Sequence, residues 1–274
     1  MNEILKDLSP ERLVIAIEEN LSSWIPVFSV IGESRLNDPP GVNRSVSSIP
    51  IALFNSIMDA RLEPEKVDTT IQCIKTDAEA RKVPVLWWVG PSTRPLNLGR
   101  QLEEYGFIID DEGPGMAVNL ASLNYSPPLA EGLDIHRVLD DVTIREWCAT
   151  MAIGFEIPPE KSEFAADNWF KLISRVDTGT TQAFTAWLHG KPVATSLLQL
   201  GAGVAGIYGV STIPEARRKG IGAQVTLYPL LQAHSMGYEA GILQASEIGF
   251  PVYRSLGFQE YCRITSYIYR PELS

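Results

Sequence analysis

A basic cluster followed by two closely spaced glycines interrupts the segment "GIYGVSTIPEARRKGIGAQVT", residues 206–226. The apolar run before the cluster is typical of a strand, and the residues after Gly222 are typical of a helix. A strand-to-helix turn with glycines at the helix mouth leaves several backbone N–H groups without partners, and such groups bind anions. The turn therefore predicts an anion site beside Arg217, Arg218 and Lys219, although a solvated, purely structural turn is the alternative interpretation.

Two common phosphate motifs do not match this turn. Lys219 precedes Gly220 and no Gly-Lys-Ser/Thr follows, so the Walker pattern of nucleotide phosphoryl transfer is absent. The dinucleotide pattern G-x-G-x-x-G fails because Val225 stands at the third glycine position, and because the preceding strands are expected to be antiparallel. Binding of NAD or FAD is therefore not expected.

The elements around the turn form a recognisable order. Hydrophobic periodicity and turn residues predict strand, helix, helix, three antiparallel strands, helix, strand, short helix and strand, with a turn at His189-Gly190 and a kink at Pro229. The corresponding segments are 133–140, 140–155, 161–176, 181–189, 191–200, 203–212, 217–236, 239–246, 249–258 and 263–270.

This order and the turn together resemble one superfamily. Arg217, Gly220 and Gly222 satisfy the pattern [Q/R]-x-x-G-x-[G/A], with "GIYGVST" before it and "ILQAS" and "VYRSLGF" after it. Over about 133–270 the chain resembles the GNAT superfamily of N-acetyltransferases. The resemblance implies an α+β fold with a mixed, mostly antiparallel twisted sheet flanked by helices. It also implies transfer of an acetyl group from acetyl-CoA to a primary amine by direct attack.

The first half repeats the end of this order, with segments 49–62, 63–83, 84–91 and 94–107, and Gly106 closes its last helix as Gly257 closes the later one. "DARLEPEKVD" replaces the glycine turn. We therefore expect a degenerate GNAT-like domain at 1–124, a linker at 125–132 containing Pro127 and Pro128, and a catalytic GNAT domain at 133–274.

The resemblance also implies which positions contact acetyl-CoA. Backbone N–H groups of the turn would cradle the pyrophosphate, and the strand before the turn would pair with the pantetheine arm. Ser246 stands where the family often has a cofactor-binding asparagine. The implied positions are Val210, Ser211, Thr212, Arg217, Arg218, Lys219, Gly220, Ile221, Gly222, Ala223, Ser246 and Tyr253.

Three residues are implied to act in catalysis. The Val210 N–H is the expected oxyanion donor. Tyr253 is the expected general acid for the departing thiolate, with a core tyrosine packed beside Phe258 as the alternative. The base that deprotonates the amine is not named by any motif; Glu156 is the first candidate and Glu247 the second, and both could be solvated carboxylates.

Composition limits the partners. The chain has 33 acidic and 23 basic residues, a net charge of −10 that disfavours nucleic acid and weakly favours an amine. The scattered cysteines and histidines predict no metal site. No run approaching the ~18 apolar residues of a membrane span is expected, so the predicted location is the cytoplasm. An oligomer is left open.

Two other classes of function are compatible with the sequence. A non-catalytic acyl-CoA-binding regulatory module would keep the turn and lack a productive acceptor site, and a tandem structural protein would bind no cofactor. The acceptor, a small molecule or a peptide, is not specified by the sequence. In the first half, strand alternation sends one of Trp87 and Trp88 into the core and the other to the opposite face.

Overall fold

The computed structural model describes residues 3–123 and 130–272. The chain forms two compact units, and each is built from two separate segments. Unit 1 comprises Met1–Asn20 and Gly115–Tyr261, and unit 2 comprises Leu21–Pro114 and Cys262–Ser274. Most of the predicted linker at 125–132 lies outside the described residues, so the domain boundaries drawn from the sequence stay a prediction.

The sheet of unit 1 contains the predicted antiparallel meander. Strands β6 (Leu133–Arg137), β7 (Thr181–Leu188), β8 (Lys191–Gly201) and β9 (Val204–Thr212) pair antiparallel in chain order. Strand β10 (Ala240–Gln244) lies parallel to β9, and the end of β5 (Ile108–Asn119) pairs antiparallel with β10. The β7–β8 turn is formed by His189 and Gly190, both with positive φ, as two-residue hairpin turns require.

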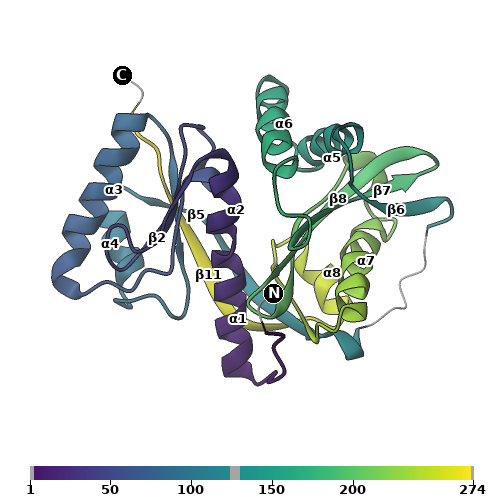
Figure 1. Cartoon of the computed structure of the whole chain (residues 1–274), viewed down its shortest axis with the longest axis horizontal. Helices are drawn as coiled ribbons and strands as arrows, with labels where there is room; N and C mark the ends of the chain where they lie inside the picture. The colour runs from purple at the N-terminus through teal and green to yellow at the C-terminus, as the bar shows by residue number, and fades with distance from the viewer. Residues whose placement is uncertain (1–2, 124–129, 273–274) are drawn as a thin grey trace. The chain divides into compact units, whose positions relative to one another are not determined.

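Helices cover both faces of this sheet (Figure 1). Helices α5 (Asp141–Gly154) and α6 (Pro159–Ile173) lie on one face, and α7 (Ile221–Ser235) lies on the other with the short α8 (Phe250–Ser255) packed against it. The aspartate start predicted for the first helix is confirmed, because the Asp140 side chain and Thr143 form a reciprocal capping box.

The N-terminal helix belongs to the same unit as the later strands. Helix α1 (Pro10–Ser22) is bonded to the strands of unit 1 through Asn20, which is wholly buried. The Nδ2 of Asn20 donates to Gln199 O at 3.1 Å and to Gly201 O at 2.9 Å. These bonds satisfy carbonyl groups at the end of the β8–β9 hairpin. The first twenty residues thereby group with the C-terminal half rather than with their neighbours in sequence.

The helical stretch Pro10–Ile31 qualifies the expectation about membrane spans. Its 22 residues are long and apolar enough to cross a membrane by length and composition, with a mean hydropathy of 1.3. Buried positions make up 39% of its most apolar window, and a single helix of this kind near the N-terminus is weak evidence for a span.

Unit 2 has a smaller mixed sheet in the order β1 (Glu33–Arg35), β2 (Asn43–Val46), β3 (Ser56–Met58), β4 (Val85–Val89) and β11 (Gln259–Tyr269). Strand β11 enters unit 2 because its residues from Thr265 pair antiparallel with β4. Its helices are α2 (Trp24–Phe28), α3 (Val67–Arg81) and α4 (Leu98–Glu104). Short 3-10 turns, η1 to η5, occupy Ser29–Ile31, Ala52–Asn55, Pro64–Lys66, Leu120–Ser122 and Pro214–Ala216.

The predicted repeat is visible in the order of elements. In each unit a strand leads through a helix to a parallel neighbour: β3 through α3 to β4, and β9 through α7 to β10. Trp87 of β4 is wholly buried, while Trp88 is half-buried and donates Nε1 to Ser56 Oγ, as strand alternation predicts. The turn before α3 has no glycine and carries Glu63 and Glu65.

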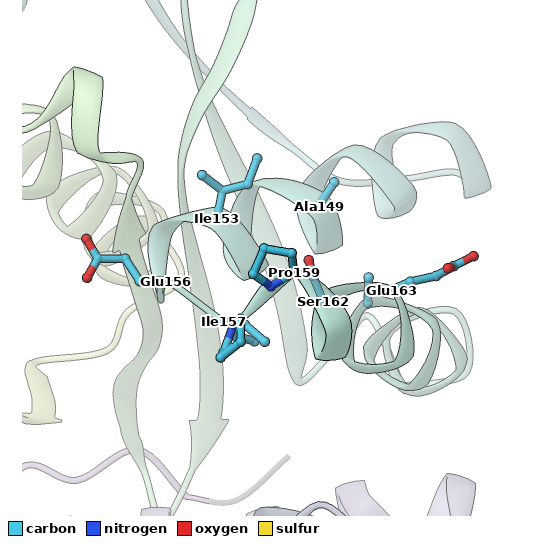
Figure 2. Close-up of a pocket in the computed structure, with 9 residues that line it drawn as sticks. Ala149, Ile153, Glu156, Ile157, Pro159, Ser162 and Glu163 are labelled. Atoms are coloured by element: carbon cyan, nitrogen blue, oxygen red, sulfur yellow. The ribbon is translucent and has the colours of Figure 1, made fainter.

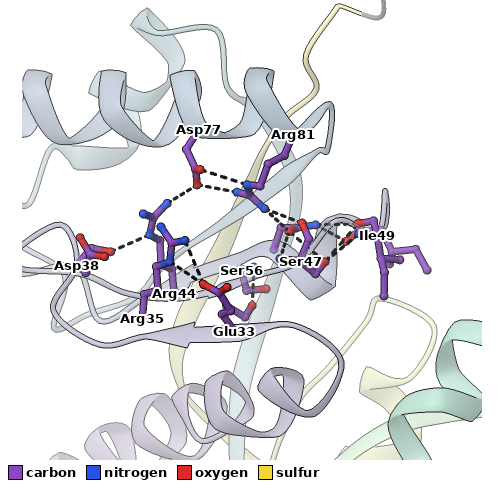
Figure 3. Close-up of polar contacts among 12 residues, drawn as sticks. Glu33, Arg35, Asp38, Arg44, Ser47, Ile49, Ser56, Asp77 and Arg81 are labelled. Atoms are coloured by element: carbon purple, nitrogen blue, oxygen red, sulfur yellow. Dashed lines mark hydrogen bonds and ion pairs between the residues drawn. The ribbon is translucent and has the colours of Figure 1, made fainter.

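An ionic network braces unit 2 (Figure 3). Asp77 on α3 accepts from Arg44 Nη1 and Arg81 Nη2, each at 2.7 Å. Burial raises the pKa of Asp77, but the hydrogen bonds and charges of Arg81 and Arg44 outweigh that effect, and the net pKa is lowered. The Arg44 side chain is only 6% exposed, so this carboxylate compensates a buried charge.

Candidate functional site

The basic turn lies between η5 and the start of α7 in unit 1. Arg218 (φ 65°) and Gly220 (φ 76°) are left-handed, and Gly220 is the N-cap of α7. The Ala223 N–H donates to Gly220 O at 3.1 Å, so Ala223, a predicted cradle donor, is already engaged. Within the described residues, no hydrogen bond uses the backbone N–H groups of the five residues before it, which are Arg218, Lys219, Gly220, Ile221 and Gly222.

Gly222 has no packing reason to be glycine. A Cβ built there meets only Thr212 Oγ1, at 3.7 Å, which is ordinary van der Waals contact. Gly222 lies in the first turn of α7, where glycine costs roughly 0.5–1 kcal/mol relative to alanine. The space above it is therefore left open by the protein itself, beside the unpaired N–H groups, as a close-fitting anion would require.

The neighbouring strands part beside this turn. Strand β10 pairs with β9 only at Ala205 and Gly206, while β9 continues to Thr212. Opposite Ser196 of β8, β9 has two residues, Gly209 and Val210, which form a β-bulge. Strand β9 thus has an open edge toward the gap, at Val210 and the residues around it.

Each of the three side-chain nitrogens of Arg217 donates one hydrogen bond within the protein. Its Nε donates to Thr212 O at 3.0 Å, Nη2 donates to Gly154 O at 3.0 Å, and Nη1 donates to Glu156 Oε1 at 2.8 Å. These bonds join the end of β9, the end of α5 and the α5–α6 loop. Arg218 and Lys219 are exposed side chains beside the unpaired N–H groups.

Glu156 ends α5 in an unusual way. Its N–H donates to Ile153 O, and the N–H of Ile157 donates to Ala152 O, the bonding of a Schellman motif. The residue at the left-handed position of that motif is usually glycine, but here it is Glu156 with φ 54°. A left-handed non-glycine residue costs about 1 kcal/mol, and the carboxylate of Glu156 accepts from Arg217 Nη1.

Tyr253 lies in α8 as predicted, and its ring packs against Phe258 with centroids 6.0 Å apart. Its side chain is 8% exposed, and burial raises its pKa to about 12. Ser246 Oγ accepts from the Gly249 N–H at 3.2 Å, so Ser246 caps the turn that leads into α8. Glu247 is exposed on that same turn.

An open cavity of ≈ 690 Å³ lies along α5, α6 and their connecting loop (Figure 2). Ile153, Ile157 and Pro159 give it an apolar lining, and Glu163 lies at its α6 side. Figure 2 shows Glu156 pointing away from Glu163, so the two carboxylates do not converge on one point. The cavity is a candidate place for the body of an apolar ligand.

Pro229 lies within α7, and the helix continues past it. Proline has no N–H to donate to the carbonyl of Val225, four residues earlier. The buried Ser196 hydroxyl donates to Val225 O at 2.8 Å instead. The helix that carries the turn is thereby bonded to β8 opposite the bulge, and the kink expected at Pro229 stays a prediction.

The contact between Asn20 and Tyr208, near the strand gap, was missed by sequence reasoning. Asn20 Oδ1 accepts from the Tyr208 hydroxyl at 2.8 Å, and a Cβ on Gly206 would meet Asn20 Oδ1. Asn20 therefore contacts β9 where β10 departs. A polar residue in an amphipathic helix near the N-terminus carries no local signal of this contact, whereas "GIYG" itself hinted at close backbone approach.

Solved structures share this arrangement over most of the chain. A GCN5-related N-acetyltransferase from Kribbella flavida is 19% identical, covers 96% of this chain and 96% of its own, and has a TM-score of 0.68. A GCN5-related N-acetyltransferase from Sphaerobacter thermophilus is 19% identical, with 80% and 74% covered and a TM-score of 0.60. A tandem GNAT protein from the clavulanic acid biosynthesis pathway is 13% identical, with 85% and 79% covered and a TM-score of 0.58.

These likenesses define the class of fold. The protein has the GNAT fold in its tandem form, as the resemblance of the sequence implies, with mixed and mostly antiparallel sheets flanked by helices. No protein-family model and no curated protein matches the sequence.

Proposed function

We propose that this protein is an N-acyltransferase that transfers an acetyl group from acetyl-CoA to a primary amine, and that the site lies in unit 1. The observation that supports this most is the turn before α7, where five consecutive N–H groups without partners among the described residues end at Gly222, which has open space above it. The GNAT fold supports acyl transfer in general, and the chemistry of the turn favours a pyrophosphate.

Acetyl-CoA fits this donor set. The backbone from Arg218 to Gly222 would hold the pyrophosphate, with the side chains of Arg218 and Lys219 adding charge. The open edge of β9 at Val210, Ser211 and Thr212 would pair with the amide groups of pantetheine. Ser211 would act through its backbone only, because its buried hydroxyl bonds Thr195 Oγ1 at 2.8 Å.

The residues around the strand gap supply the groups that acyl transfer needs. The Val210 N–H, in the bulge, would donate to the oxyanion that forms when the amine attacks the thioester carbonyl. Tyr253 would donate a proton to the departing thiolate, and with a pKa of about 12 it remains protonated at neutral pH. Ser246 would contribute little to binding, since its hydroxyl already caps a turn.

Two carboxylates are candidates for the base that deprotonates the amine. Glu156 is the first candidate, but its carboxylate accepts from Arg217 at 2.8 Å, so it would receive the proton of the amine through water rather than directly. Glu247 is exposed and has no such partner among the described residues. We retain both as candidates and rank Glu156 first, because it belongs to the loop that lines the cavity.

A second function has one observation in its favour. A non-catalytic acyl-CoA-binding module would keep the turn, and a Tyr253 pKa of about 12 makes this tyrosine a poor proton donor to a thiolate. Turnover with any amine excludes the module. We further propose a cytoplasmic protein without nucleic-acid or membrane partners and with no resident metal; its oligomeric state is left open.

The test is the melting temperature with and without saturating acetyl-CoA. A ligand at 100 times its Kd stabilises the native state by about 2.7 kcal/mol, which corresponds to a rise of roughly 5–10 °C for a domain of this size. S-acetylpantetheine, which lacks the pyrophosphate, is the matched control and should give a much smaller shift. No shift at millimolar acetyl-CoA refutes the proposal, and a shift justifies an amine screen that follows thiol release.

A further inference from the structure

Arg217 joins three different elements through a single side chain. Its three nitrogens donate to Thr212 O at the end of β9, to Gly154 O at the end of α5, and to Glu156 in the following loop. Surface ion pairs alone contribute little to stability. The guanidinium group is planar, however, and it fixes the directions of all three bonds at once. Arg217 therefore holds the three elements in one relative arrangement.

The backbone on the α5 side is shaped for this contact. A Cβ on Gly154 would collide with Ser211 Oγ and lie 3.2 Å from the Thr212 N, so α5 ends in direct contact with β9. Two residues later, Glu156 occupies a left-handed position that favours glycine. Glu156 thus carries a carboxylate at a backbone position that favours glycine, and this carboxylate pairs with Arg217.

We propose that Arg217 and Glu156 are a positioning pair, which holds the α5–α6 loop against the strand that leads into the phosphate turn. The loop contributes Ile157 and Pro158 to the lining of the open cavity, so the pair fixes one wall of that cavity relative to the turn. Arg217 is then not a phosphate ligand, although its place in the turn suggests one. This inference rests on the proposed function only for the identity of the anion.

The experiment measures two quantities on the full chain. Hydrogen exchange of the Glu156 and Ile157 amides reports the loop, because these N–H groups bond to Ile153 O and Ala152 O at the end of α5. The Kd of acetyl-CoA, from calorimetry, reports the turn. Arg217→Gln should accelerate exchange of both amides at least tenfold and change the Kd less than threefold. Arg218→Gln, the matched control, should weaken binding at least fivefold and leave the exchange unchanged.

Two variants of Glu156 distinguish the effect of the Arg217–Glu156 pair from the intrinsic stability of the C-terminus of α5. Glu156→Gly places the preferred residue at the left-handed position, so it protects the Ile157 amide if the carboxylate has no role. The positioning pair predicts faster exchange instead. Glu156→Gln keeps an oxygen that accepts a hydrogen bond from Arg217, so the loop amides should exchange nearly as slowly as in the unmodified protein. If the contact depended on charge alone, Glu156→Gln would accelerate exchange as much as Glu156→Gly.

The inference is overturned if Arg217→Gln weakens acetyl-CoA binding as much as Arg218→Gln and leaves the loop amides unchanged, since Arg217 would then be a phosphate ligand. It is also overturned if Glu156→Gly slows exchange. If the unmodified protein does not bind acetyl-CoA, the proposed function fails, whereas the exchange rates still decide whether the pair holds the loop.

Discussion

Replacing Gly222 with alanine separates the stability of the turn from its binding role. The new methyl group meets only Thr212 Oγ1, at 3.7 Å, so no atom of the protein has to move. Because Gly222 lies in the first turn of α7, alanine should stabilise the helix by about 0.5 kcal/mol. That gain corresponds to a rise in Tm of roughly 1–2 °C. The same methyl group enters the space left beside the unpaired N–H groups, and we expect acetyl-CoA to bind at least about tenfold more weakly, a loss of about 1.4 kcal/mol.

Scanning calorimetry without ligand and titration calorimetry with acetyl-CoA measure the two effects on one preparation. Leu231→Ala is the control, because Leu231 is 41% exposed on α7 and lies far along the helix from its N-terminus. It should leave the affinity unchanged. Gly222→Val should weaken binding further, since it adds two methyl groups. Unaltered affinity in both glycine variants, together with an unaltered or higher Tm, would show that no ligand approaches the turn and would refute the proposed cradle.

Four further substitutions test other parts of the structure. Tyr253→Phe should lower kcat by about 100-fold or more with little change in the Kd of acetyl-CoA, and the pH–rate profile of the unmodified protein should show no loss from this tyrosine below about pH 11; unchanged turnover excludes it as the acid. Ser196→Ala removes the donor to Val225 O and should cost about 1–3 kcal/mol in urea unfolding. Adding Pro229→Ala, which restores a helical N–H, should recover part of that loss, and no recovery contradicts the assignment. Asp77→Asn should lower the Tm at pH 7, with the difference shrinking as the pH falls below about 4, because a lowered native pKa gives stability above the unfolded pKa that is lost in acid; a difference that does not shrink at all in acid contradicts this origin.

The sequence predicted the features that depend on nearby residues. The start of α5 at Asp140, the His189-Gly190 turn and the opposite environments of Trp87 and Trp88 each follow from a few adjacent residues. The glycine turn was found for the same reason, since its pattern lies within six residues. Gly222 could be singled out because glycine near a helix start has a distinct conformational cost.

The features that were missed depend on contacts between distant segments. Strand β11 pairs from Thr265 onward with β4, which lies in the first half of the chain. Asn20 reaches the end of the β8–β9 hairpin from the N-terminal helix. Arg217, for which the turn alone suggests a phosphate contact, has partners in β9, α5 and the α5–α6 loop. No periodicity or local motif encodes such pairings, because they are selected by the packing of the finished fold.

The environment of Tyr253 limits how it can serve as the acid. Proton transfer from a group with a pKa of about 12 to a thiolate of ordinary pKa, about 8.5, is uphill by about 3.5 units, or about 5 kcal/mol. A turnover number of about 10 per second corresponds to a barrier of about 16 kcal/mol, so a step of this size is compatible with catalysis. Under the proposed mechanism the transfer would therefore accompany thiolate departure, when the hydrogen bond from the tyrosine strengthens as charge develops on sulfur. Burial keeps Tyr253 protonated at neutral pH, and its ring packs against Phe258, so under the proposed mechanism it would donate from a fixed position.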